Sequence, residues 1–389
     1  MLNRLNNLLL LIVLAAFVIG LVNIGQATET RLSSMGGVGY FTRDNTNIFY
    51  FPGTIKMYPG LVIAELRTKN TQDSYTIGGN FKFNDDKVLG VYLNRPINLV
   101  NYEFAVNYVA NLDYVELNNT TDFLMGMPLG DWNFGCRLSL AFDSYKQDST
   151  ATDYGDDETA HYINVGLGLS NEKIDVGVHF EMPSAKSTEE NGLEDKISGT
   201  GFGIVARMFT GEKMQFVPVG LLKVSSAKYD HTFNNATTTD KFSGLNLSVG
   251  AGLNYQVSDN ALIVAAVEAI GLSKLKAEFD GGPKTTVTAM DFPGIYLGAE
   301  SQINKWLIGR IGAVQVMQGT KTKVEDQGVT ESETTVRTKH YRVTFGLGIA
   351  LGDFKLDVSL NEGLLFDGPN FISGTTETIA DKISLTYEF

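Results

Sequence analysis

Apolar and polar positions alternate with a period of two along much of the chain. Between 132 and 142 every even position is apolar, from Trp132 to Phe142, while the odd positions are Asn, Gly, Arg, Ser and Ala. Successive side chains of a β-strand point to opposite faces, so the pattern predicts a strand with one apolar face. The same alternation recurs in 163–170, 174–181, 245–257 and 341–351.

The alternating stretches are long for a soluble protein. Strands of soluble sheets average about five or six residues, whereas a tilted strand that crosses a bilayer needs about 9–11. The stretch 245–257 alternates throughout. Such lengths favour strands that cross a membrane.

The connections between these stretches alternate in length. Tight connections are found at 84–87, 170–173, 210–213, 257–260, 303–305 and 351–353. Long polar stretches lie between them, at 144–159, 183–198, 225–240, 272–288, 318–336 and 362–380. Short turns at one end and long loops at the other are typical of outer-membrane barrels. We therefore predict an all-β fold, a closed antiparallel transmembrane β-barrel of about 14–16 strands over 59–389, with 95–120 its least regular part.

The last residues, KISLTYEF, form one more alternating stretch. Ile383, Leu385, Tyr387 and Phe389 fall on one side of it. We interpret it as the strand that closes the barrel, since an open edge in lipid would leave amides without partners. The ending also resembles the carboxy-terminal signal by which outer-membrane barrels are recognised, and Tyr387 and Phe389 would carry that insertion signal for the insertion machinery.

The beginning of the chain resembles a secretory leader. Asn3 and Arg4 precede an uninterrupted apolar or glycine run, 8–22, and Gly25-Gln26-Ala27 offers small residues for cleavage. We interpret 1–27 as a signal peptide; a retained membrane anchor is the competing interpretation, but the run is short of the roughly 18 residues that are usual. Together with the barrel pattern, the signal peptide predicts that the protein is located in the outer membrane of a double-membraned bacterium, where outer-membrane lipid would surround the wall.

Composition excludes some classes of protein. The net charge of −13 argues against a nucleic-acid partner, and the single cysteine, Cys136, forms no internal disulfide. The four histidines, at 161, 179, 231 and 340, have no metal-like spacing. We therefore expect no cofactor, no metal and no catalytic site.

Residues 28–58 lack long alternation and carry Gly and Pro where strands cannot continue. This segment would lie at the mouth of the barrel and fold into its lumen as a plug. It contains the sequence MGGVG, then Asp44, then YFPG. The positions concerned are Met35, Gly36, Gly37, Gly39, Asp44, Tyr50, Phe51, Pro52 and Gly53.

These residues resemble the start of the long-chain fatty-acid transporter (FadL) family of hydrophobic-compound channels and its secretion-linked relatives. Members have a pattern like MGGAG, an acidic residue and YNPAG; here Phe51 replaces the Asn and Gly53 the Ala. The resemblance implies a plugged channel for the uptake of small hydrophobic molecules. The alternatives are a scaffold or binding barrel linked to secretion or surface attachment, in which nothing crosses, and a general porin.

Charged residues fall on the polar faces of the predicted strands. Mixed signs in one lumen favour an ion-pair network that braces wall and plug, whereas a selectivity filter would need one sign at one depth. The residues are Arg137, Asp175, His179, Glu181, Arg207, Lys223, Glu268, Glu300, Arg310, Arg342, Lys355 and Asp357.

Overall fold

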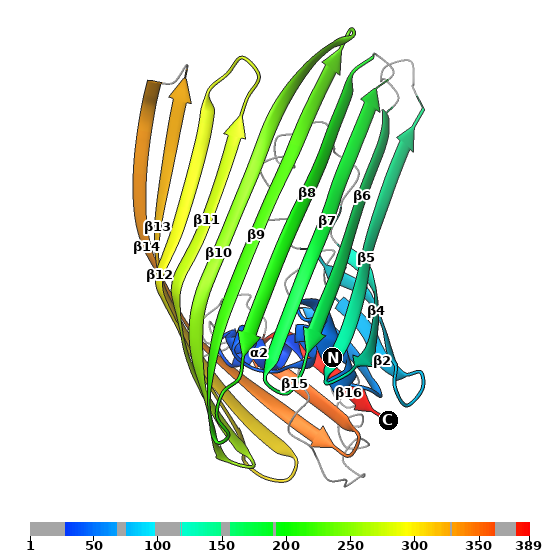
Figure 1. Cartoon of the computed structure of the whole chain (residues 1–389), viewed down its shortest axis with the longest axis vertical. Coiled ribbons are helices and arrows are strands. Elements are labelled where there is room, and N and C mark those ends of the chain that lie inside the picture. Colours follow the sequence, from blue (N-terminus) through cyan, green and yellow to red (C-terminus); the bar gives the residue numbers. More distant parts are fainter. Residues whose placement is uncertain are drawn as a thin grey trace, which may run out of the picture.

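A computed structural model describes residues 28–67, 75–97, 117, 119–148, 156–189, 192–326, 329–361 and 379–389. The proposed signal peptide, most of the stretch 95–120 and the polar stretch 362–378 lie outside the described residues. The described residues form a closed barrel in which every strand pairs with its two neighbours in antiparallel order (Figure 1). The predicted all-β closed antiparallel barrel is confirmed.

The wall contains sixteen strands among the described residues. They are β1 Leu61–Arg67, β2 Tyr75–Lys82, β3 Val88–Pro96, β4 Asn119–Leu129, β5 Trp132–Gln147, β6 Asp156–Ser170, β7 Ile174–Glu189, β8 Glu194–Met208, β9 Met214–Phe233, β10 Ala236–Ser258, β11 Ala261–Glu278, β12 Lys284–Gln302, β13 Leu307–Asp326, β14 Val329–Leu351, β15 Phe354–Leu360 and β16 Ala380–Glu388.

The terminal stretch closes the barrel, as predicted. β16 pairs with β15 on one side and with β1 on the other, so that Leu385 lies opposite Ala64. Its polar residues Ser384 and Thr386 are buried, whereas Leu385 is 44% exposed. Burial of the polar face and exposure of the apolar face is the reverse of what a water-soluble sheet shows.

This inversion extends around the wall. Large apolar side chains such as Leu167, Phe202 and Leu253 are exposed, while inward-facing positions of β7 and β8 carry buried charges such as Asp175 and Arg207. Buried charges therefore lie in the interior, beside apolar clusters that pack on the N-terminal segment, while the outer surface carries large apolar side chains.

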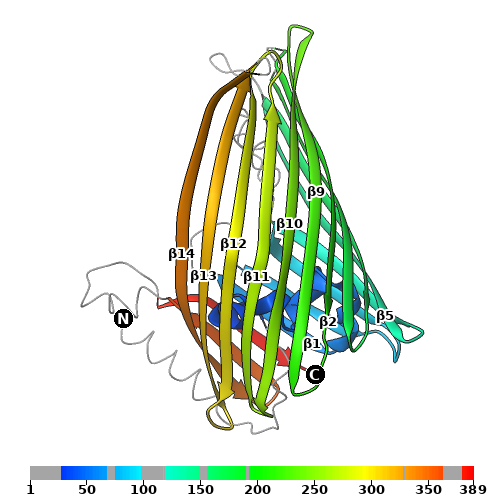
Figure 2. The same cartoon turned by 60° about the vertical axis from the view of Figure 1, so that its left-hand side comes forward.

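The strands differ in length around the barrel. β1 to β4, β15 and β16 have 7 to 11 residues, whereas β5 to β14 have 15 to 23, so that one side of the wall rises far above the other (Figure 2). The prediction of long polar loops at 183–198, 225–240, 272–288 and 318–336 is wrong. These stretches largely continue the strands, because each pairs with its neighbour there. Threonines in 225–240 and 318–336 favour the extended backbone, and Asn234 and Asn235, both with positive φ, form the tight turn between β9 and β10.

The N-terminal segment lies within the barrel, near the end with the tight turns (Figures 1 and 2). It contains one short α-helix, α2 Glu29–Ser34, and three 3-10 helices, η1 Val38–Tyr40, η2 Asn45–Phe49 and η3 Pro52–Met57. α2 packs against β13 to β16 and η3 against β3 to β7. In the described part of the chain, no helix combines the length and the apolar character needed to cross a bilayer.

Candidate functional site: the N-terminal segment and the cavity beside it

Glycines on the inner face of the wall let the N-terminal segment lie directly against the strands. A Cβ atom on Gly135 would overlap the carbonyl of Pro52, and one on Gly177 would overlap that of Tyr50. On the opposite side of the lumen, a Cβ on Gly312 would overlap the Gly36 amide. Backbone therefore touches backbone on two sides of the barrel, and larger residues at these wall positions would force the segment inward.

A buried ion-pair network joins α2 to the wall. The Arg31 guanidinium donates to both carboxylate oxygens of Glu300 at 2.8 Å each and to Asp44 at 3.2 Å. Glu300 also accepts from Arg310 at 2.6 Å, and Arg310 lies 2.8 Å from Asp357. These five side chains are at most 5% exposed, so each charge depends on its partners rather than on water.

A second network fixes the middle of the segment. Arg207 donates to Asp175 at 2.8 Å and to the carbonyls of Tyr40 and Thr42 at 3.1 and 2.7 Å. Its guanidinium also lies 4.4 Å from the centre of the Phe51 ring, within the range of a cation–π contact. Arg43 of the segment adds a further pair to Asp175, at 3.1 Å.

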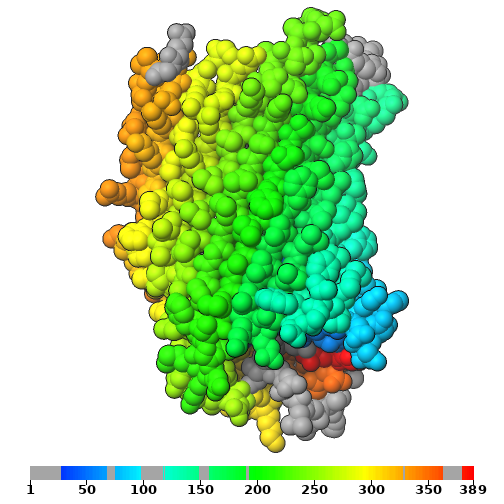
Figure 3. Space-filling view, in the orientation of Figure 1, coloured from blue at the N-terminus to red at the C-terminus, as the bar shows by residue number. Residues whose placement is uncertain are grey.

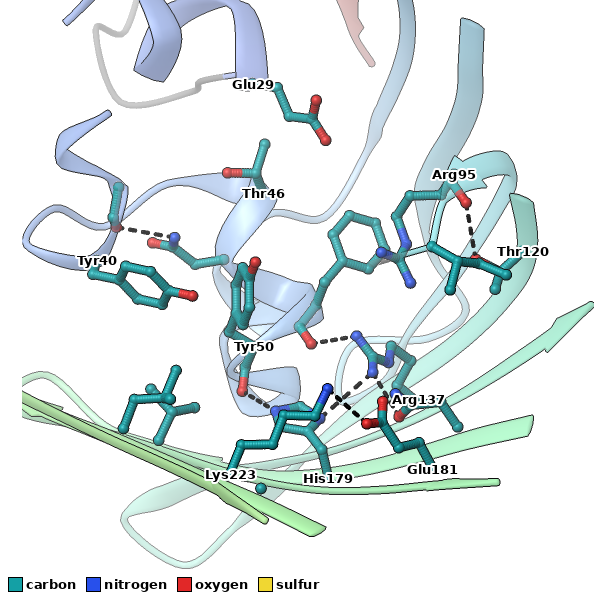
Figure 4. Close-up of a pocket in the computed structure, with 18 of the residues that line it drawn as sticks. Glu29, Tyr40, Thr46, Tyr50, Arg95, Thr120, Arg137, His179, Glu181 and Lys223 are labelled. Carbon is teal, nitrogen blue, oxygen red and sulfur yellow. Dashed lines mark hydrogen bonds and ion pairs between the residues drawn. The ribbon is translucent and has the colours of Figure 1, made fainter. Parts of the chain in front are cut away.

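A cavity of about 410 Å³ lies between the N-terminal segment and one side of the wall. The segment contributes Leu32, Tyr40, Phe49 and Tyr50, and strands β3 to β9 contribute polar and apolar side chains. Figure 4 shows Tyr40 and Tyr50 on one side of this space and Arg137, His179, Glu181 and Lys223 on the other. The Tyr40 and Tyr50 rings lie 5.1 Å apart.

The polar side of the cavity is a hydrogen-bonded array. Arg137 donates to the Phe49 carbonyl and, at 2.8 Å, to Asn164. His179 Nε2 contacts the Tyr50 carbonyl at 2.8 Å, and Lys223 pairs with Glu181 at 2.6 Å. The array holds the Phe49–Tyr50 backbone in place, so that the aromatic rings keep their positions at the cavity.

Two carboxylates of the segment have shifted pKa values. Burial acts to raise the pKa of Glu29, but Lys382 and Arg67 outweigh it and the pKa is lowered. Burial raises the pKa of Asp44, because Arg31 and the hydrogen bonds from Thr46 offset only part of the desolvation. The Glu29 contacts to β1 and β16 therefore contribute stability at neutral pH that is lost as the pH falls through the lowered pKa.

The predicted motif residues are placed as follows. Met35 and Phe51 are fully buried, and Asp44 begins η2 through a capping box with Asn47. Gly36 and Gly37 have positive φ in the turn after α2, and Pro52 and Gly53 lie against Gly168 of the wall. Gly39 and Tyr50 line the cavity.

The structure brings together most of the predicted charged residues, but in separate groups. Glu300, Arg310, Lys355 and Asp357 lie beside α2, and Asp175 with Arg207 lies beside η1. Glu268 instead accepts from Ser248 and Tyr296, and Arg342 is exposed on β14. Tyr387 and Phe389 lie on the outer surface, where Tyr387 stacks on Phe354 at 4.6 Å.

The two arginines of the segment, Arg31 and Arg43, and the pair of Arg95 with Asp122 are functional contacts that the sequence pattern did not predict. Arg95 makes two hydrogen bonds to Asp122, at 2.7 and 2.9 Å, and lies 4.4 Å from the centre of the Phe49 ring. A signal was present, because Arg31 and Arg43 are the cations that a lumen containing several carboxylates would require in a plug.

No family model matches the chain, and no curated protein matches it. Among solved structures, it is similar to the CymD monoaromatic hydrocarbon channel, with 11% identity over 95% of this chain and 99% of that chain and a TM-score of 0.39. The TodX monoaromatic hydrocarbon channel deltaS2 mutant aligns over 92% and 98%, with 11% identity and a TM-score of 0.37. CdiB from Acinetobacter baumannii aligns over 85% and 59%, with 11% identity and a TM-score of 0.38.

The two hydrocarbon channels belong to the kind of barrel that the N-terminal motif resembles. TM-scores and identities of this size define neither a substrate nor a mechanism for this chain.

Proposed function

We propose that this protein is an outer-membrane channel, closed by its N-terminal segment, for the uptake of small hydrophobic molecules. The observation that carries the proposal is the cavity of about 410 Å³ formed jointly by that segment and the wall. A molecule held there contacts both parts, so that movement of the segment would change its path.

The inverted surface supports the placement in a membrane. A band of exposed Leu, Val, Ile and Phe follows the outer face of the wall, and closure of the sheet leaves no strand edge between β1 and β16. Residues 1–27 would be the leader that directs export, residues 28–58 the plug and residues 59–389 the transmembrane barrel. Tyr387 and Phe389 would serve recognition by the insertion machinery.

The contacts of the segment support its role as a plug. It is held on two sides of the lumen, by the Arg31 network at β12, β13 and β15 and by the Arg207 network at β7 and β8. A general porin would keep this space open to water. A segment with buried charges on both sides is instead fixed in position and moves only when these pairs exchange partners.

The lining of the cavity supports a small hydrophobic substrate. Aromatic and aliphatic side chains such as Tyr40, Tyr50 and Leu221 face a space large enough for a small molecule. The polar groups opposite them are already engaged with one another, as in the pair of Lys223 with Glu181. The cavity therefore offers apolar contact with polar groups at one side, and we assign it binding and passage rather than catalysis.

A tryptophan at Leu221 tests the cavity. Leu221 faces the lumen on β9, and the larger ring of L221W would project into the cavity and narrow it. We expect uptake of radiolabelled toluene by bacterial cells producing the variant to fall at least about tenfold, because a blocked site removes the binding step.

The matched control is V224W, on the same strand. Val224 is 41% exposed and faces outward, so its replacement adds the same ring without entering the cavity. We expect wild-type uptake from V224W. Equal uptake by L221W and the wild type would remove the cavity from the route.

A further inference from the structure

The outer surface of the wall carries a patch of lysines just beyond the apolar band. On strands β8 to β11, one outward-facing row across the wall consists of Ser198, Lys228, Lys241 and Glu278, and Lys284 of β12 follows. The next row contains Thr200, Ser226, Ser243 and Lys276. Figure 3 shows this outer surface, on which the strands concerned run through the green and yellow part.

The parity of the strands places these residues outside the barrel. Phe202 and Val224 directly follow Thr200 and Ser226 in the outward-facing series, and both are more than 40% exposed on the apolar surface. Residues of the opposite parity, such as Ala227 and Phe242, are buried. The lysines therefore lie on the outer face of the wall, between the apolar rows and the ends of β8 to β11 that are far from the tight turns.

Two features of the patch point to an anionic ligand. Lys228 and Lys241 lie directly opposite each other in the antiparallel pair, an arrangement of like charges that destabilises a sheet. Among the described residues neither lysine has a carboxylate in ion-pair contact. Asp230 of the next outward-facing row lies opposite Lys196 and accepts from Thr239, and Glu278 interacts with Lys241, Lys276 and Lys284 together. Three lysines around one carboxylate leave an excess of positive charge on a chain whose net charge is −13.

The patch is also hollowed. A depression of about 510 Å³ is lined by hydroxyl groups of Ser198, Thr200, Ser226 and Ser243, by Lys228, Lys241 and Lys276, and by one carboxylate, that of Glu278, which pairs with Lys276. Hydroxyl groups and ammonium groups around one space can donate hydrogen bonds to the oxygens of a phosphate. The next outward-facing row toward the tight turns is Phe202, Val224 and Leu245, followed by Lys274 on β11.

We propose that this depression binds the phosphate group of a lipid in the outer leaflet, with the acyl chains on the apolar rows beside it. The order of rows carries the inference, because a single amphiphilic molecule needs a phosphate site directly next to an apolar surface. A soluble anion would need only the lysines. The inference rests on the proposed placement in the outer membrane but not on the plug or the cavity.

Native mass spectrometry of the full chain in neutral detergent tests this site. The probes are dioleoylphosphatidic acid, dioleoylphosphatidylcholine and inorganic phosphate. We expect the wild type to retain phosphatidic acid in preference to phosphatidylcholine, and K228Q/K241Q/K276Q to lose roughly tenfold or more of that preference, since each lysine at a membrane surface contributes to the attraction of anionic lipid. K228R/K241R/K276R keeps the charges and is expected to keep the preference.

The matched control is K87Q/K173Q/K305Q, which removes three exposed lysines from the tight-turn end. It should bind the lipids as the wild type does. Equal preference in the patch variant and this control would overturn the site, and displacement of the lipid by inorganic phosphate at equal concentration would overturn its assignment to a lipid. If the patch variant loses the lipid preference but takes up toluene normally, the lipid site is independent of the channel. If the wild type fails to take up toluene but still binds the lipid, only the proposed channel is refuted.

Discussion

Replacing Arg31 by methionine is expected to destabilise the docking of the N-terminal segment by about 3–5 kcal/mol, the usual cost of breaking a buried ion pair on one side. Arg31 is the group through which the segment reaches Glu300, and it also neutralises Asp44 within the segment. Without it, Glu300 keeps Arg310 as a partner, but the Asp44 carboxylate keeps only neutral donors, the backbone amide and the hydroxyl of Thr46. Methionine fills similar space, so the loss is mainly electrostatic.

The measurement is the rate at which proteinase K cuts within 28–58 while the barrel stays folded. We expect R31M to be cut at least about a hundredfold faster than the wild type, since cleavage follows the population of the released segment. R31M/D44N removes the orphaned carboxylate and is expected to recover part of the protection.

R43M is the matched control in the same segment. Arg43 pairs with Asp175, but Asp175 keeps its 2.8 Å contact with Arg207 when Arg43 is lost. Its side chain is also 24% exposed, so water replaces part of the contact. We expect a much smaller change in cleavage, and equal rates for R31M and R43M would refute a special role for the Arg31 network.

Replacing Gly312 by alanine is expected to push the segment off the wall. The added methyl group would overlap the Gly36 amide and lie 2.6 Å from Thr344 Oγ1. Thr344 accepts from the Gly36 amide and donates to the Ser34 carbonyl, both at 3.0 Å. Overpacking of this kind costs about 1–3 kcal/mol, which would release the turn after α2 in a substantial fraction of molecules.

Single-channel conductance in planar bilayers measures this release. We expect the wild type to be closed and G312A to show openings, because the displaced turn leaves a water path along β13. G203A is the control, since Gly203 also faces the lumen but the nearest atom to its added Cβ is 3.7 Å away. Openings in the wild type as frequent as in G312A would show that the segment does not close the pore.

The alternation of residues decided more of the fold than any motif did. Each side chain of a strand is assigned to one of two faces by position alone, so the stretch from Trp132 and the terminal KISLTYEF could be assigned an apolar outer face directly. The same reasoning failed for 225–240, where polar residues on both faces suggested a loop. β9 pairs with β10 there across the turn at Asn234 and Asn235. β8 pairs with the other side of β9 as far as Thr232, and this second contact lies outside the local pattern.

The sequence by itself thus determined a closed barrel, its terminal strand and a separate N-terminal segment, because these follow from a two-residue period and from Gly and Pro that interrupt it. Only the tertiary structure decided which charges meet. Arg31 and Glu300 are 269 residues apart, and the outward position of Lys228 opposite Lys241 depends on the register of two strands. Contacts of this kind arise when the wall closes around the segment, since closure fixes both the register and the depth at which each side chain faces the lumen or the membrane.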